Sequence, residues 1–155
     1  MIFPSIQGDT VSGKAFRVPD NFRGRYNVAL LAFTQEHQVL VNTWMPFLRR
    51  LKQGCAHIGV YEVPVLKEFS LPERWLIDYW MRTGIPDQEV RDTTITLYTD
   101  VDAFLTALDL SDRSTIHVLL VDPQGKVYWQ TMGEYTPDKF ADLTAVLNEL
   151  MEPVL

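Results

Sequence analysis

The residues of this sequence with the widest chemical repertoire are a single cysteine and three histidines. Cys55 and His57 alternate in one short stretch, and His37 precedes them. A zinc-type site needs three or four ligands with supporting hydrogen bonds, and no second cysteine completes such a set. We therefore interpret Cys55 as a buried thiol, His57 as a strand residue and His117 as part of an apolar strand, and we expect no metal and no cofactor.

Acid–base and phosphate chemistry are equally poorly supported. His37 stands beside Glu36 and could act as a general base, but no motif supplies a serine or cysteine nucleophile for it. A surface or helix-capping position is the expectation for this histidine. Asp122 and Gly125 have the spacing of a tight turn, and neither a Walker nor a dinucleotide fingerprint is present.

Composition places the chain among globular proteins of one domain, residues 1–155. It has 46% hydrophobic and 22% charged residues, and its formal net charge of -6 gives no general attraction to nucleic acid. One cysteine cannot form an internal disulfide, which fits a reducing compartment. We expect a cytoplasmic or organelle-matrix protein without a signal peptide and without the ~20 apolar residues of a membrane span.

The hydrophobic periodicity alternates between strands and helices. An unbroken apolar run after a turn predicts a strand buried on both faces, and apolar steps of three and four residues predict an amphipathic helix. Predicted strands cover residues 26–33, 57–64, 93–98, 116–121 and 126–131; predicted helices cover 36–52, 100–108 and 137–151. Residues 15–19 read as a small strand or edge piece, and residues 66–92 as mostly helical and irregular. This order predicts an α/β fold with a mixed, five-stranded central sheet, helices on both faces and a helical insert.

Several motifs resemble one superfamily. Gly13-Lys14, Phe16-x-Val18-Pro19 and Phe22-x-Gly24-Arg25, followed by an apolar strand ending at Phe33, are similar to the opening of peroxiredoxin and TlpA-like proteins. Residues 116–127, which read IHVLLVDPQGKV, are similar to a later strand–turn motif of the same proteins. The resemblance implies a thioredoxin-like fold for nearly the whole chain.

The chemistry of that superfamily is missing from the matching positions. Its CxxC cysteines fall on Gln38 and Val41, and Ile116 stands where the resemblance implies a cis-proline. Thiol–disulfide exchange needs a thiolate, which neither an amide nor a valine can supply. We expect a thioredoxin-like fold without redox activity.

The middle and end of the chain resemble a more specific family. The carrying motifs are 80–91 (WMRTGIPDQEVR), then Asp122-x-x-x-Lys126-Val127-x-Trp129-x-x-x-Gly133 and Thr136-Pro137. They are similar to the thioredoxin-fold assembly factors of the mitochondrial F-type ATP synthase and their bacterial relatives, although Thr131 replaces a glycine of that family. The resemblance implies a non-catalytic chaperone or assembly factor whose partner is a protein, namely a subunit of a membrane complex.

An aromatic segment supplies the candidate binding surface. Residues 75–81 contain six apolar or aromatic residues out of seven, and tryptophan and arginine often carry binding energy at interfaces. Trp75, Trp80, Arg82 and Arg91 are therefore predicted to contact a partner, the alternative being a helix buried on most sides. The alternative function is a peroxiredoxin-like, thiol-dependent oxidoreductase using Cys55, and the sequence leaves a homo-oligomer open.

Overall fold

The computed structural model describes residues 2–10, 14–66 and 93–151. Its central element is a seven-stranded mixed sheet in the order β2-β1-β5-β4-β3-β6-β7. Its strands are β1 (Ile6–Thr10), β2 (Ala15–Val18), β3 (Tyr26–Ala32), β4 (Ile58–Leu66), β5 (Ile95–Tyr98), β6 (His117–Val121) and β7 (Val127–Met132). Its helices are α1 (Gln38–Gly54), preceded by the 3-10 turn η1 (Gln35–His37), α4 (Val101–Ala107) and α5 (Pro137–Met151). The α/β class predicted from the sequence is confirmed.

The predicted strand number of five is wrong, because two further strands extend one edge of the sheet. β1 pairs antiparallel with β2 and with β5, so an N-terminal hairpin continues the sheet beyond β5. Gly8 and Asp9 give β1 a weak strand signal in the sequence. Gly8 is required there because a Cβ at this position would lie only 2.7 Å from a methyl carbon of Leu97.

β3 is an inner strand of the sheet, which explains its unbroken apolar run. It pairs in parallel with β4 and antiparallel with β6, and all seven of its residues are buried. β4 continues through Pro64 to Leu66, so the predicted strand end at the proline is also wrong. The extension follows from pairing, since Val65 and Leu66 lie opposite Leu97 and Tyr98 of β5, and the φ of proline is compatible with extended backbone.

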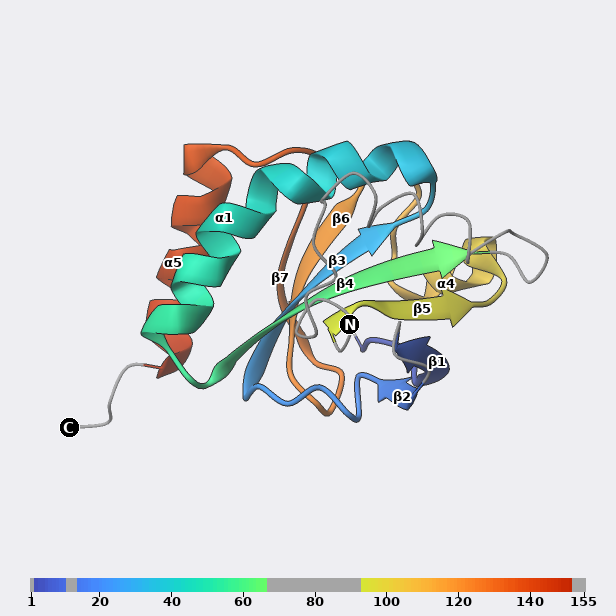
Figure 1. Cartoon of the computed structure of the whole chain (residues 1–155), viewed down its shortest axis with the longest axis horizontal. Coiled ribbons are helices and arrows are strands. Elements are labelled where there is room, and N and C mark those ends of the chain that lie inside the picture. Colours follow the sequence, from blue (N-terminus) through green and yellow to red (C-terminus); the bar gives the residue numbers. More distant parts are fainter. Residues whose placement is uncertain (1, 11–13, 67–92, 152–155) are drawn as a thin grey trace.

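Helices cover both faces of the sheet, as predicted. One core cluster joins α1 and α5 to β3, β4 and β6 through Trp44, Leu48, Leu143 and Leu147, all at most 3% exposed. The opposite cluster contains Phe104 and Leu105 of α4 together with aromatic side chains of the N-terminal region. Figure 1 shows α1 and α5 on one side of the sheet and α4 apart from them.

The termini of the helices follow local sequence signals. Asp100 caps α4, because its carboxylate accepts a hydrogen bond from the Ala103 N–H at 3.1 Å. Thr136 accepts one from the Lys139 N–H at 3.2 Å, and Pro137 opens α5. The helical insert was predicted for residues 66–92; Leu66 instead ends β4, and residues 67–92 lie outside the described residues.

Candidate functional site

The end of β3 and the start of α1 occupy the place of a thioredoxin active site. Phe33 and Thr34 follow β3, η1 makes one tight turn, and α1 then begins at Gln38. Gln38 is 6% exposed and Val41 is 1% exposed. The two positions that would carry cysteines are therefore a buried amide and a buried aliphatic side chain, and neither can form or break a disulfide.

Gln38 belongs to a buried polar network. Its Nε2 donates to Asn42 Oδ1 at 3.0 Å and lies 3.4 Å from Glu62 Oε1 in the middle of β4. Thr94 Oγ1 donates to the other oxygen of Glu62 at 3.1 Å. Glu62 is only 6% exposed, and a buried carboxylate needs such donors. The network fastens the start of α1 to the sheet at the point where redox relatives carry their first thiol.

Glu62 is the site residue that the sequence analysis missed. The signal for it was present, because a lone acidic residue interrupts the otherwise apolar run from Ile58 to Leu66. A charged residue buried in a central strand is rare unless it is paired. Such an interruption predicts a polar partner facing it across the sheet or from a helix.

His37 is buried, so the predicted surface position is wrong, whereas the capping position is confirmed, because His37 is the N-cap residue of α1, although its side chain makes no capping hydrogen bond. Its Nδ1 accepts a hydrogen bond from the Phe33 N–H at 3.0 Å, which holds the turn between β3 and η1. Burial is the largest influence and lowers the pKa of His37 below 6.5, and a backbone hydrogen bond with Ser114 opposes that effect. Since Nδ1 must be unprotonated to accept, both observations describe a neutral structural histidine.

His117 is confirmed as a sheet residue. It is 2% exposed, and its Nε2 contacts the backbone oxygen of Asp112 in the loop that precedes β6. The ring of Phe33 lies edge-to-face with His37 and with His117, at centroid distances of 6.1 and 6.0 Å. The two histidines thus contact the backbone of this loop, at Ser114 and Asp112, and hold it in place.

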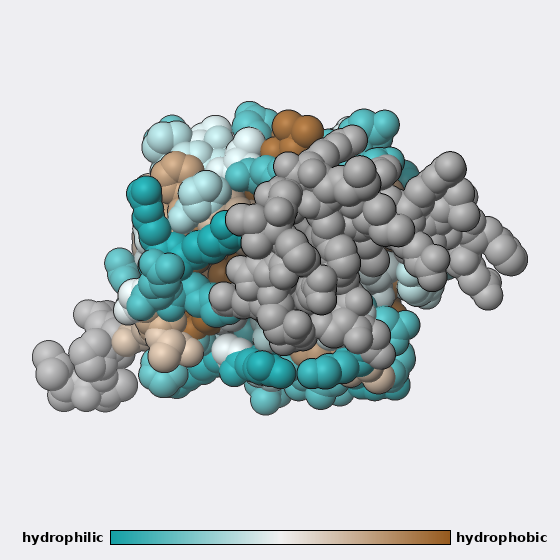
Figure 2. Space-filling model, viewed as in Figure 1, coloured by the Kyte–Doolittle hydropathy of each residue, from teal (hydrophilic) through white to brown (hydrophobic). Residues whose placement is uncertain are grey.

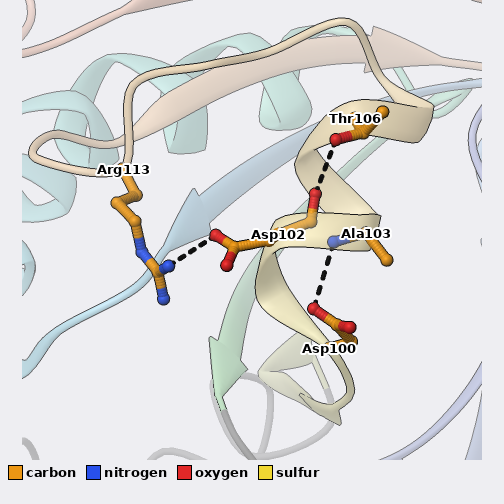
Figure 3. Close-up of polar contacts among 5 residues, drawn as sticks. All are labelled: Asp100, Asp102, Ala103, Thr106 and Arg113. Carbon is orange, nitrogen blue, oxygen red and sulfur yellow. Dashed lines mark hydrogen bonds and ion pairs between the residues drawn. The ribbon is translucent and has the colours of Figure 1, made fainter.

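The loop between α4 and β6, residues 108–116, is fixed by charged contacts as well. Arg113 Nη1 lies 2.6 Å from Asp102 Oδ1 on α4, directly beside the capped first turn of that helix (Figure 3). Hydrogen bonds from Ser114 to the Asp112 carboxylate lower the pKa of Asp112. Ile116, at the predicted cis-proline position, is fully buried and accepts a hydrogen bond from the Gly133 N–H at 3.0 Å.

Cys55 lies far from this region. It caps the C-terminal end of α1 and is half-buried, whereas Gln38 begins the same helix. The 17 residues of α1 separate the two positions by about 25 Å. Within the described part of the chain no group of histidine, cysteine and acidic residues could hold a metal ion, and Cys55 and His57 form no such pair.

The predicted partner-contacting residues Trp75, Trp80, Arg82 and Arg91 lie outside the described residues. The described ranges contain a cavity of about 480 Å³ near the start of β4. Arg23 and Lys52 line it together with Tyr61. It is separate from the buried network of Gln38 and Glu62.

The fold and the site together define a thioredoxin-like protein without the redox cysteines. The solved structure of BsSco, a member of the Sco family of cytochrome c oxidase assembly proteins, has a TM-score of 0.67 at 15% identity. The match covers 98% of this chain and 95% of BsSco. A putative electron transfer protein from Aquifex aeolicus has a TM-score of 0.66 at 13% identity. The match covers 95% of this chain and 94% of that protein. A putative thiol:disulfide interchange protein DsbE from Chlorobium tepidum has a TM-score of 0.59 at 15% identity. The match covers 96% of this chain and 95% of that protein.

The family is shown by sequence. The profile of the ATP10 protein family matches residues 1–150, and the chain belongs to that family. No curated protein sequence matches the chain significantly. The resemblance to ATP synthase assembly factors inferred from the motifs is thereby confirmed.

Proposed function

We propose that this chain is a non-catalytic assembly factor that binds a protein subunit of the ATP synthase complex. The observation that carries the proposal is the combination of the family match over residues 1–150 with a buried amide and valine at the CxxC positions. A fold of this class without its thiols retains a binding surface but no electron-transfer chemistry. The partner is a membrane-complex subunit, and no described helix of this chain is long and apolar enough to cross a membrane itself.

Oxidoreductase activity through Cys55 is the competing function. The half-buried position of Cys55 at the end of α1 argues against it, because the thiol lies about 25 Å from the helix start that lowers a thiol pKa in such proteins. No second thiol exists in the chain to resolve a mixed disulfide. Cys55 is accordingly proposed to act as a packing residue.

The partner surface is proposed to include Trp75, Trp80, Arg82 and Arg91, and the compartment to be the cytoplasm or an organelle matrix. The test is chemical cross-linking of tagged chain in source cells, followed by identification of ATP synthase subunits among the linked peptides. Cross-links to one ATP synthase subunit that survive Cys55→Ser support the proposal. Cross-links that require Cys55 and are released by reductant would indicate thiol exchange and contradict it.

A further inference from the structure

The charged side chains of this protein are separated along the strand direction. The end where β3 and β5 finish carries the acidic residues Glu36, Asp100, Asp102, Asp112, Glu134 and Asp138. The opposite end, where β3 and β4 begin, carries five exposed cations that we name the basic end: Arg23, Arg25, Arg49, Arg50 and Lys126. The chain as a whole has 20 acidic and 14 basic residues, so a basic end is unexpected from its composition.

The topology brings these cations to one end from three segments. Arg23 and Arg25 directly precede β3. Arg49 and Arg50 lie in the later part of α1, which returns the chain to the start of β4. Lys126 lies in the β6–β7 hairpin, which adjoins the start of β3 because Val121 pairs with Asn27. In Figure 2 the surface over the C-terminal half of α1 is largely hydrophilic.

These cations have aromatic rather than acidic neighbours. Arg25 lies over the Tyr26 ring at 5.7 Å, Arg50 over Phe47 at 6.0 Å, and Lys126 over Tyr128 at 4.9 Å. In the described ranges none of the five forms an ion pair, whereas Arg113 at the other end is paired with Asp102 (Figure 3). Carboxylates of the described ranges therefore do not neutralise these charges by direct contact.

Few described carboxylates stand near the basic end, and two of these are engaged. Asp122 accepts hydrogen bonds from the Gln124 and Lys126 N–H groups and from the Tyr128 hydroxyl. Asp20 accepts one from Ser5. Glu149 lies near the end of α5, whose Leu150 carbonyl accepts from the Tyr26 hydroxyl.

Apolar and tyrosine side chains accompany the charges. Ile2 is 61% exposed and forms an isolated β-bridge with Lys126. Tyr26 and Tyr128 pack edge-to-face at 5.5 Å, and burial raises the pKa of Tyr128 to about 12, so its hydroxyl stays neutral. Tyr26 itself is buried, so the surface here consists of cations, the partly exposed Tyr128 and the exposed Ile2, which matches the composition of surfaces that rest on a membrane interface.

We infer that the basic end docks on the surface of a membrane that contains anionic lipids. Each cation near such a surface strengthens binding about fivefold, and the acidic end points away from the bilayer. The net charge of -6 does not prevent this, because at physiological salt charges farther than about 8 Å from the surface are largely screened. This docking stands independently of the assembly function and would place the protein beside a membrane complex.

The experiment is flotation of the purified full chain with unilamellar vesicles. One set contains phosphatidylcholine alone and the other contains phosphatidylcholine with about 30% phosphatidylglycerol. We expect the protein to float with the anionic vesicles at about 0.15 M salt, where the screening length is about 8 Å, to remain behind with neutral vesicles, and to dissociate near 1 M salt, where the screening length is about 3 Å. Absence of flotation with anionic vesicles at about 0.15 M salt would overturn the inference.

Matched variants locate the surface. Removing two cations of the basic end with Arg25→Gln and Arg49→Gln should lower the vesicle partition coefficient at least about fivefold. Removing two cations of the acidic end with Arg113→Gln and Lys139→Gln changes the net charge equally and should leave it within about twofold. Equal losses in both variants, or binding to soluble polyglutamate but not to vesicles, would overturn the inference in favour of a net-charge effect or an acidic protein partner.

Discussion

Gln38 Nε2 lies 3.4 Å from Glu62 Oε1, so the first residue of α1 reaches a carboxylate buried in the central strand β4. The amide stands where a redox relative has its first thiol. The same helix start and sheet position are thus kept, with a hydrogen-bonded structural contact in place of a reactive sulfur.

Gln38→Leu should destabilise the fold by about 1–3 kcal/mol, because it removes a donor from a buried carboxylate. Chemical denaturation measures the change in the free energy of unfolding. Val39→Ala, at a position 61% exposed in the same helical turn, is the control and should change stability by less than about 0.5 kcal/mol. Equal effects of the two substitutions would show that the contact with Glu62 contributes nothing.

Trp44→Phe should cost about 1–3 kcal/mol of stability. Trp44 is fully buried, and its Nε1 donates to the Gly133 carbonyl at 3.0 Å, which ties α1 to the turn after β7. Phenylalanine keeps most of the apolar contact but leaves that carbonyl without its donor. Thermal unfolding measures this loss. Met132→Ala is the control, because it truncates an exposed side chain beside the same turn and should therefore show any general effect on that turn without removing the hydrogen bond.

Acidification should weaken the fold through His37. Because its pKa is lowered on folding, the unfolded chain takes up the proton first as the pH falls below about 6.5. The contribution of neutral His37 is therefore complete above that pH and declines below it, until the folded-state pKa is reached. Unfolding free energies measured between pH 7 and pH 5 should show a slope that His37→Gln reduces and that substitution of the exposed His57 leaves unchanged. A slope that survives His37→Gln would assign the pH dependence to other groups.

Trp80→Ala distinguishes a partner-contacting residue from a core residue. If Trp80 contacts the partner, as proposed, the substitution should cost at least about 2 kcal/mol of affinity with little change in thermal stability. A loss of about 3–5 kcal/mol in stability would instead identify ordinary packing. Arg82→Ala and Arg91→Ala, measured in the same capture experiment, keep the surface hypothesis testable if Trp80→Ala fails to fold. Normal capture by both would remove this segment from the binding surface.

The sequence predicted those parts of the fold that have a strong local signal. The apolar run of β3, the three- and four-residue steps of α1 and the Thr136-Pro137 helix start each carry one, and each is present in the structure. β1 was not predicted because Gly8 hides the strand pattern and because its pairing with β5, more than 80 residues away, is a long-range contact.

For the candidate site, the sequence predicted only which residues are absent, namely the two cysteines of the CxxC motif. That Gln38 and Val41 lack a thiol is visible in the sequence, but the partner of Gln38 is not, because Glu62 is 24 residues away and comes near only when β4 pairs beside β3. His37 was misplaced for a similar reason. Its burial depends on Phe33, His117 and the loop before β6 closing around it, and no local pattern shows this.

The most direct test of the proposed function is the amount of assembled ATP synthase in source cells that lack this chain, resolved on native gels. Assembled enzyme should fall in the deletion strain and return when either the wild-type chain or Cys55→Ser is expressed, because assembly is proposed to need binding and not thiol chemistry. Unchanged assembly in the deletion strain, or rescue by the wild type but not by Cys55→Ser at equal protein level, would contradict the proposal.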